Sequence, residues 1–236
     1  MTWSNTNGKT FLTFSKAFIP EQQAVIEQFI QFIRHDKEDR FTFADVCAGD
    51  GWLTEALLTH YPNATAIALD RTEALQSVMK SSLDRLHQRI TYRHFELMDD
   101  TWTQYLTPVD YVFSSLSFHH IDNDHKLKLF QQLYRSLQPD GGFMFFDIVT
   151  PTDEEERLQY ADEWDAVVRA QSMHYFGNEE AYDYFANNEW NIYRDAEAMA
   201  YPATIATHLR LLNDVGFRTV MTTKMKAGHV LFSGFK

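Results

Sequence analysis

A glycine-containing turn follows the first β-like run of the sequence and is a candidate ligand site. In "FADVCAGDGW", residues 43–52, the run carries Asp45 and continues through Gly49 and Gly51 into a helical pattern. Glycines let a backbone reach unusual dihedral angles and approach a ligand closely. In a parallel sheet, ligands bind outside the carboxyl ends of the strands, where this turn would lie. A glycine pair after a strand is also common in a plain tight turn.

An acid at the end of the next β-like run strengthens the ligand interpretation. Asp70 lies 19 residues after Gly51, where a carboxylate can accept both hydroxyls of a ribose, although such an acid can also be a helix cap. Turn and acid together predict a nucleoside-containing cofactor. A nicotinamide dinucleotide is the weaker alternative, because it favours a further glycine or alanine for close helix packing, and Thr54 stands there instead.

The elements that would position these residues follow from the hydrophobic pattern. Five β-like runs alternate with three helical patterns between Phe41 and Ile148, which is typical of βαβ units and a parallel sheet. Before them, Pro20 is expected at the first position of a helix. After them, we expect a helix that stops at Gly216 and two closing strands. The five runs are 41–46, 65–70, 90–95, 110–115 and 142–149.

This pattern divides the chain into four parts. We expect an N-terminal arm and helix over 1–40, a cofactor-binding core over 41–150, a helical substrate cap over 151–203, and a C-terminal helix and strand pair over 204–236 that completes the core. The 236 residues, 44% of them hydrophobic, suit one well-filled domain with an insertion.

Charge and composition exclude several classes of function. A net charge of -12 disfavours nucleic acid as a partner, because phosphate binding depends on lysine and arginine. No apolar run is long enough to span a bilayer and the N-terminus lacks a signal-peptide layout, so we expect no membrane association and a cytoplasmic protein. The single cysteine excludes a disulfide framework, and no spacing predicts a metal site.

Taken together, these motifs resemble the class I S-adenosylmethionine-dependent methyltransferases, particularly the small-molecule branch. "DVCAGDG" resembles the first motif, "ALD" ending at Asp70 the second, and "VDYVFSSLSFHHI" the fourth strand with its His-His ending. Glu96 and Leu97 stand where the family has an acid for the adenine amino group and an apolar residue against the ring. "LQPDGGFMFFDI" resembles the turn before the fifth strand. The likeness covers 41–148 well and the C-terminal part loosely.

The resemblance implies a fold and a cofactor. The fold would be α/β, a Rossmann-like doubly wound sheet of about seven mostly parallel strands with the last antiparallel, plus a helical cap inserted after strand 5. The cofactor would be S-adenosylmethionine, with S-adenosylhomocysteine as product and no metal. The expected cofactor-binding residues are Asp45, Cys47, Ala48, Gly49, Gly51, Asp70, Arg71, Glu96, Leu97 and Ser115.

Two residues depart from the family pattern. Cys47 replaces the first glycine, so the backbone there must accept a Cβ, and we expect a small packed residue rather than a reactive thiol. Glu96 replaces the usual aspartate and lengthens the reach by one methylene.

By resemblance, the reaction transfers a methyl group from a sulfonium to a nucleophilic atom. The protein must align donor and acceptor and, where the acceptor carries a proton, remove it. Histidine suits that role because its usual pKa is near neutrality. His119 is the candidate base, at the end of the fourth strand, while a structural hydrogen-bonding role for His119 and His120 is an open alternative.

The cap carries what information there is on the acceptor. It combines 13 acids with ten aromatic residues across 151–201, which would suit a cationic or aromatic acceptor. The alternative is a cap whose acids face water and whose aromatics pack on the domain, with "DEEE" at 153–156 as the first turn of a helix. The candidate substrate residues are His174, Tyr175, Trp190 and Tyr193.

The predicted function is methylation of a small-molecule acceptor on nitrogen or oxygen, with a lean to nitrogen from the acidic cap. Two alternatives stay open: an NAD(P)-dependent oxidoreductase, and a non-catalytic nucleoside-binding or regulatory protein on the same fold. The sequence predicts neither the acceptor nor the oligomeric state.

Overall fold

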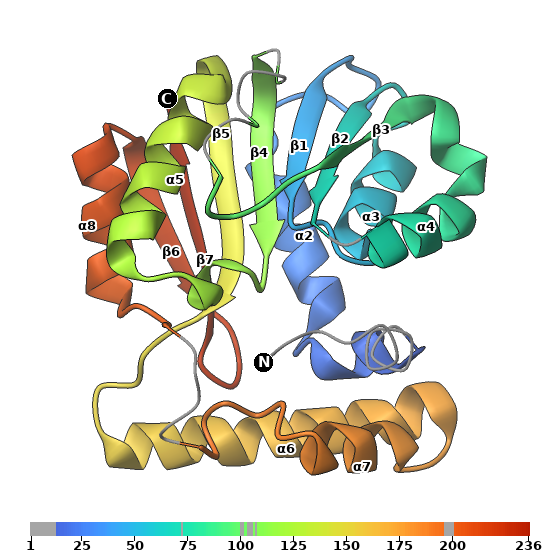
Figure 1. Cartoon of the computed structure of the whole chain (residues 1–236), viewed down its shortest axis with the longest axis vertical. Helices are drawn as coiled ribbons and strands as arrows, with labels where there is room; N and C mark the ends of the chain where they lie inside the picture. The colour runs from blue at the N-terminus through green and yellow to red at the C-terminus, as the bar shows by residue number, and fades with distance from the viewer. Residues whose placement is uncertain (1–12, 72, 100–101, 103–105, 107, 196–200) are drawn as a thin grey trace.

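The computed structural model describes residues 13–71, 73–99, 102, 106, 108–195 and 201–236. Its centre is a seven-stranded sheet in the order β3-β2-β1-β4-β5-β7-β6 (Figure 1). β7 runs antiparallel to its neighbours β5 and β6, and the remaining pairs are parallel. The predicted fold class is confirmed. The strands are β1 Thr42–Val46, β2 Thr65–Asp70, β3 Ile90–His94, β4 Val109–Ser115, β5 Leu137–Ile148, β6 Arg218–Lys224 and β7 His229–Phe235.

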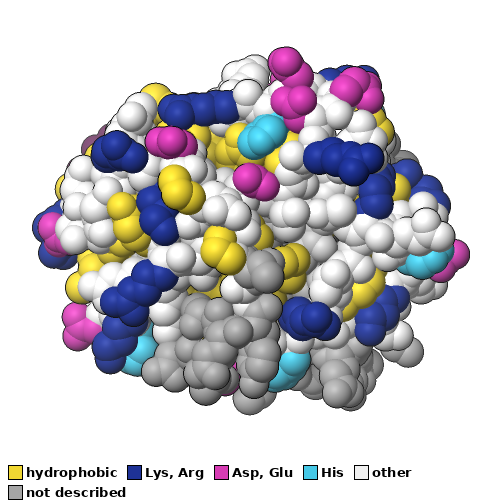
Figure 2. All heavy atoms as spheres, turned by 90° about the horizontal axis from the view of Figure 1, so that it is seen from above, with side chains coloured by type: hydrophobic (Ala, Val, Ile, Leu, Met, Phe, Trp, Pro, Cys, Tyr) yellow, Lys and Arg dark blue, Asp and Glu magenta, His cyan; other side chains and the backbone are white. Residues whose placement is uncertain are grey.

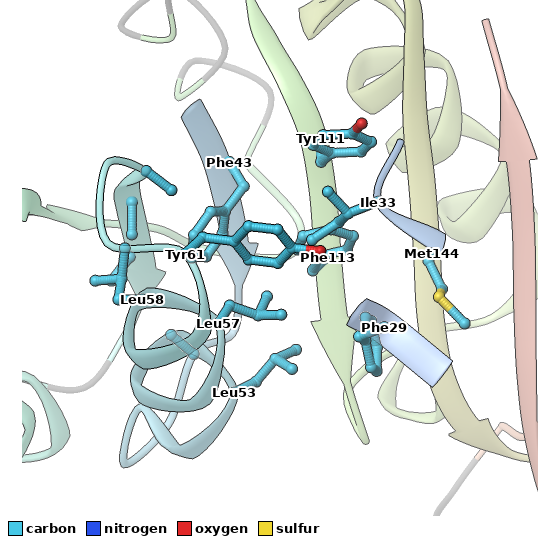
Figure 3. Packing of buried hydrophobic residues seen from close by; sticks show 14 of the residues in the cluster. Phe29, Ile33, Phe43, Leu53, Leu57, Leu58, Tyr61, Tyr111, Phe113 and Met144 are labelled. Atoms are coloured by element: carbon cyan, nitrogen blue, oxygen red, sulfur yellow. The ribbon is translucent and has the colours of Figure 1, made fainter. Parts of the chain in front are cut away.

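Helices cover both faces of the sheet (Figure 1). On one face lie α2 Gln22–Phe32, α3 Trp52–His60 and α4 Glu73–Ser82, followed by the 3-10 helix η1 Asp84–Arg89. Their buried side chains, among them Phe29 and Leu57, pack against Phe113 of β4 (Figure 3). On the other face, α5 Asn123–Ser136 and α8 Ile205–Val215 pack over β5 through a second core cluster.

Capping residues explain where several helices begin and end. The carboxylate of Asp122 accepts the N–H of His125 at the start of α5, and the hydroxyl of Thr204 accepts the N–H of Thr207 at the start of α8. These bonds satisfy donors that a helix start otherwise leaves unpaired. Gly216 ends α8 in the left-handed conformation, at φ 107°, which confirms the predicted stop.

Two boundaries differ from the sequence prediction. Pro20 does not begin α2; it lies in a turn, and Glu21, at φ 52°, separates it from the helix that starts at Gln22. The fifth strand begins at Leu137 rather than at residue 142, because Leu137 pairs with Val109 across a register shift in β4. Local pattern reading missed this shift because the intervening residues include a proline and two glycines, which usually mark a turn.

After β5 the chain forms a helical layer below the carboxyl ends of the strands (Figure 1). It contains α6 Glu154–Phe176 and α7 Glu180–Asn187, and it is called the cap below. Asp153 caps α6 by accepting the N–H of Glu156, so the acidic run forms the predicted first turn. Figure 2 shows the side of the molecule that faces away from the cap, where Lys and Arg side chains are spread over the surface.

No helix in the described part of the chain has both the length and the hydrophobicity needed to cross a membrane.

Candidate functional site

The turn after β1 takes the backbone conformation that its glycines permit. Gly49 lies at φ 57° and Gly51 at φ 83°, and Cys47, at φ 60°, adopts the same left-handed region with a Cβ attached. Such a conformation costs a residue with a side chain on the order of 1–2 kcal/mol. The N–H of Ala48 donates to the Leu69 carbonyl at 3.0 Å, which ties the turn to the end of β2.

Asp70 completes this turn. Its carboxyl oxygen Oδ2 accepts the N–H of Gly49 at 2.9 Å, and the side chain is buried at the end of β2. A Cβ added at Gly49 would meet no atom within 4 Å, so this part of the turn borders open space. The two features that predicted a nucleoside site are therefore in direct contact.

The two glycines serve different purposes. A Cβ at Gly51 would lie 2.6 Å from Cγ of Met79, so Gly51 allows α3 to pack closely against α4. Gly49 has no such neighbour. Of the pair, Gly49 is the one whose missing side chain leaves room beside Asp70.

Burial alters the acid–base behaviour of two residues near the turn. It raises the pKa of Asp45 to about 7, although the hydroxyl of Thr54 donates to its Oδ2 at 2.6 Å and opposes the shift. It also raises the pKa of the Cys47 thiol, helped by the charge of Asp70. A thiol held protonated is a poor nucleophile, as expected for a packed residue.

The remaining predicted cofactor residues lie along the same edge of the sheet. Arg71 is exposed directly after β2. Glu96 is partly exposed just after β3, with Oε1 3.6 Å from Nε2 of His94, and Leu97 packs against the second core cluster. Ser115 ends β4, and its carbonyl accepts the hydroxyl of Ser117 at 2.9 Å.

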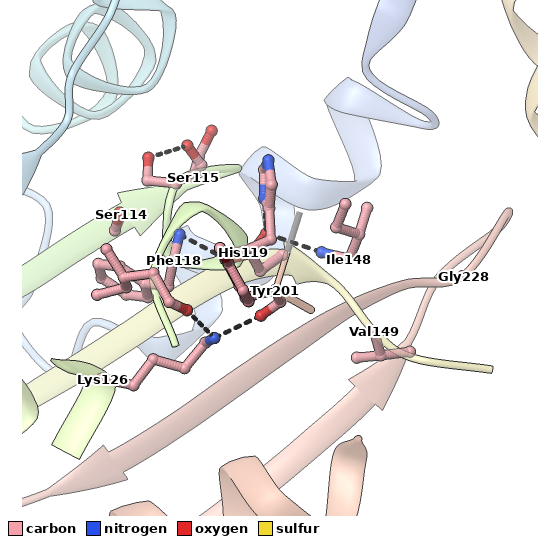
Figure 4. A network of polar contacts seen from close by, with 12 residues as sticks. Ser114, Ser115, Phe118, His119, Lys126, Ile148, Val149, Tyr201 and Gly228 are labelled. Carbon is pink, nitrogen blue, oxygen red and sulfur yellow. Dashed lines mark hydrogen bonds and ion pairs between the residues drawn. The ribbon is translucent and has the colours of Figure 1, made fainter. Parts of the chain in front are cut away.

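His119 lies in a network of polar contacts (Figure 4), and the buried carboxylate of Asp147 holds its ring. It lies in the 3-10 helix η3, Phe118–His120, and its Nδ1 is 2.6 Å from Oδ1 of Asp147 in β5. Asp147 also accepts the N–H groups of Phe118, His119 and Ile148 at 2.8, 3.1 and 2.9 Å. Burial alone would raise the pKa of Asp147, but the charge and hydrogen bond of His119 outweigh it and hold that pKa below its usual value.

The ionised state of Asp147 fixes the role of each nitrogen of His119. A carboxylate only accepts hydrogen bonds, so Nδ1 of His119 carries a hydrogen toward Asp147, and Nε2 is the ring nitrogen left to accept a proton. Sequence reasoning found His119 but missed Asp147. The available signal was one acid inside the apolar run "FMFFDIV", where an unpaired charge would be costly.

The four predicted substrate residues separate into two groups. His174 and Tyr175 are exposed at the end of α6. Tyr193 is buried, and its hydroxyl donates to the carbonyls of Val149 and Gly228 at 2.8 and 3.1 Å, while Trp190 packs in the same cluster. The structure therefore does not bring the four residues into one site.

The cap is attached to the N-terminal segment as well as to the sheet. Residues 13–18 are helical, and Trp164 of α6 donates from Nε1 to the Phe18 carbonyl at 2.9 Å. The hydroxyl of Ser15 donates to Oδ2 of Asp50 in the glycine turn at 2.8 Å. The N-terminal helical residues thus contact both the cap and the turn.

Two further structural features concern possible ligands. Among the residues that the structure describes, no group of three or more His, Cys, Asp or Glu side chains is placed to hold a metal ion.

An open hollow of about 380 Å³ lies beside the start of α5, bordered by Asp122, Asn123, Thr150, Tyr201 and Pro202.

Comparison with known proteins identifies the family. A family model described as a methyltransferase domain matches residues 43–141. Over 172 residues the chain is 30% identical to demethylmenaquinone methyltransferase of Chlamydia trachomatis serovar L2, an alignment that covers 70% of this chain and 69% of that protein.

Solved structures share the fold at low sequence identity. An O-methyltransferase family 2 protein from Planctomyces limnophilus, in complex with apigenin, has a TM-score of 0.64 at 15% identity over 99% of this chain and 62% of its own. Human N-acetylserotonin methyltransferase in complex with S-adenosylmethionine has a TM-score of 0.55 at 16% identity, over 83% and 47%. The chain spans less than two thirds of both. Sequence relative and fold agree: the chain belongs to the class I S-adenosylmethionine-dependent methyltransferases.

Proposed function

We propose that this enzyme methylates a hydroxyl group of a small-molecule acceptor, with His119 as the base. The acceptor would lie between the carboxyl ends of β4 and β5 and the cap. The 2.6 Å contact between Nδ1 of His119 and Asp147 carries the proposal. A buried carboxylate that orients an imidazole and stabilises its protonated form is a recurrent arrangement for a general base.

A general base supports methylation on oxygen, whereas the acidic cap had favoured methylation on nitrogen. A hydroxyl is a weak nucleophile until its proton is removed, whereas a neutral amine attacks through a lone pair it already has. The lean to nitrogen rested on the acids of the cap. Several of these contact neighbouring donors: Asp162 and Asp165 bind Arg194, and Glu163 accepts the N–H of Ala227. Glu155, Glu180, Asp183, Glu189 and Asp195 are exposed.

The cofactor site is proposed at the glycine turn. S-adenosylmethionine, when bound, supplies a methyl group on a sulfonium, a good leaving group. The Asp70 carboxylate would bind the ribose hydroxyls, and Gly49 would let the backbone approach the ligand, because the space beside it is open. Glu96 and Leu97 would border the adenine. Lesser contacts are assigned to Asp45, Cys47, Ala48, Gly51, Arg71 and Ser115.

An aromatic acceptor fits the apolar surroundings. Trp164 and Phe185 of the cap pack with Phe18 and Ile148 in one buried cluster next to the His119 loop. The relative from Planctomyces limnophilus binds apigenin, a phenolic compound. Within the cap, His174 and Tyr175 remain candidates for a contact at the outer rim, while Tyr193 and Trp190 would shape the space from behind.

We also propose the kind of acceptor, the division into domains and the location of the protein. The net charge of -12 supports a small acceptor over RNA. The division into 1–40, 41–150, 151–203 and 204–236, and a cytoplasmic location, remain predictions. Family membership sets aside the NAD(P)-dependent oxidoreductase.

The test is methyl transfer from labelled S-adenosylmethionine to a panel of phenols and catechols, and separately to aromatic amines. We expect labelled methyl ethers from the first panel, detected by mass spectrometry. Product from the amines alone would overturn the choice of oxygen. Tight binding of S-adenosylhomocysteine without product from either panel would favour the non-catalytic alternative.

A further inference from the structure

Lys126 is a fully buried lysine that the chemistry above does not use. It lies in the second turn of α5, and 0% of its surface is exposed. Among the described residues, no carboxylate lies within ion-pair distance of its ammonium group. Taking an ammonium out of water is costly, and the other buried side chains of α5 include the apolar Leu129 and Phe130. The lysine therefore calls for a specific reason.

The partners of Lys126 give that reason. Its Nζ donates to the carbonyl of Ile121, directly after η3, and to the carbonyl of Tyr201 at 2.6 Å (Figure 4). Tyr201 lies 75 residues away, where the described chain resumes after the cap. One buried cation thus joins two segments that are distant in sequence.

A third hydrogen bond connects Tyr201 to His119 itself. The N–H of Tyr201 donates to the carbonyl of His119 at 2.6 Å. Tyr201 is 53% exposed, and both contacts are made by its backbone, one by the carbonyl and one by the N–H. His119 is consequently held from two sides: its ring by Asp147, and its backbone by the segment that Lys126 anchors.

The same segment is attached to the end of β5. Thr150 donates from its hydroxyl to the Pro202 carbonyl at 2.6 Å and from its N–H to the Ala203 carbonyl at 3.1 Å. Since β5 also carries Asp147, the exit of the cap contacts both loops that hold the proposed base.

We propose that Lys126 is a positioning residue that locks the exit of the cap to the His119 loop, so that cap docking and placement of the base are a single event. This inference rests on the proposed function. Charge strengthens the two hydrogen bonds that Lys126 donates. Burial lowers the pKa of Lys126 to about 8, partly offset by the charges of Asp147 and Asp122, so the ammonium persists at neutral pH.

The test compares Lys126→Met with Lys128→Met in the full chain. Methionine keeps the length of the side chain without its donors, and Lys128 is an exposed lysine on the same helix. By NMR we expect the Tyr201 amide to exchange at least about tenfold faster in K126M than in K128M, the effect of losing the charge-assisted bond to the Tyr201 carbonyl. The ring Cε1–H resonance of His119 should shift in K126M only. Lys126→Arg, which keeps charge and donors, should restore part of the protection.

Two results would overturn the proposal. Equal Tyr201 exchange in K126M and K128M would show that Lys126 does not hold the segment. Faster exchange throughout the chain together with a lower Tm would show a merely structural role. If K126M does not fold, Lys126→Gln, whose shorter side chain cannot reach both carbonyls, replaces it with the same expectation. The readout needs no acceptor, so it stays distinct from a failure of His119 as the base.

Discussion

The two halves of the proposed site are assembled differently. On the cofactor side, the turn after β1 and the acid that ends β2 belong to one strand-turn-helix-strand unit, and Gly49 contacts Asp70 over 21 residues. On the acceptor side, His119 depends on Asp147, 28 residues away, and on Tyr201, 82 residues away. The Gly49–Asp70 bond stays within one such unit, whereas the bonds of His119 join elements that are farther apart in sequence. We infer that the cofactor side is less sensitive to changes in the cap than the acceptor side.

The largest expected effect is on turnover. His119→Ala should lower kcat by about 10²–10⁴, the usual contribution of a general base, once an acceptor is in hand. Steady-state methyl transfer with saturating S-adenosylmethionine measures it. A variant with full activity would return His119 to the structural role.

Asp147→Asn tests the long-range contact on which that base depends. The amide keeps the size of the side chain but not the charge that orients Nδ1–H of His119, and its NH₂ group faces hydrogen-bond donors. We expect kcat to fall by roughly 10–100-fold and the free energy of unfolding by about 3 kcal/mol. Denaturant titration gives the second value. Wild-type turnover in a folded D147N protein would separate His119 activity from Asp147.

On the cofactor side, Asp70→Ala should weaken S-adenosylhomocysteine binding by about tenfold or more, because a hydrogen bond to a charged group contributes about 1.5–3 kcal/mol. Calorimetric titration checks this. Unchanged affinity in a folded D70A protein would remove Asp70 from the cofactor site.

Cys47→Gly tests backbone strain in the glycine turn on the cofactor side, where we expect a smaller effect. Removing the Cβ from a residue at φ 60° relieves backbone strain, and we expect the free energy of unfolding to rise by up to about 1 kcal/mol. Ala48→Gly is the control, since Ala48 has no positive φ and should lose stability. A lower Tm in C47G would show that packing of the thiol matters more than strain.

The smallest effect concerns pH. Burial lowers the pKa of His208 and of His229 to about 4, from a usual value of 6.5. Between pH 6.5 and 4 the unfolded chain binds protons that the folded chain does not, so these residues lower stability as the pH falls through that window. Asp45, with a pKa of about 7, acts in the opposite direction.

The variant His208→Phe separates the contribution of His208 to the pH dependence of stability from that of Asp45. His208→Phe suits the surrounding rings of Phe130, Phe145 and Phe232. The Tm difference between H208F and wild type should grow as the pH falls from 6.5 to 4. A constant difference would show that His208 is not neutral in the fold.

The sequence predicts the cofactor side of the proposed site better than it predicts the acceptor side. The strands and the glycine turn can be predicted because each has a local sequence pattern. The bounds predicted for β1 to β5 agree with the structure to within a few residues, except that β5 begins earlier. His119 was found because two histidines follow a strand. Asp147 and Lys126 were not, because an acid inside an apolar strand indicates only that a partner is needed, and a lone lysine in a helix has no local signature. Their meaning depends on partners brought together only by folding.

One experiment tests the separation of the two halves most directly: calorimetric titration of S-adenosylhomocysteine into wild type, D70A and H119A under one set of conditions, with NAD as a control ligand. We predict equal affinity for wild type and H119A, affinity weaker by about tenfold or more for D70A, and no binding of NAD. Loss of affinity in H119A comparable to that in D70A would contradict the account, because the two halves would then form one coupled site.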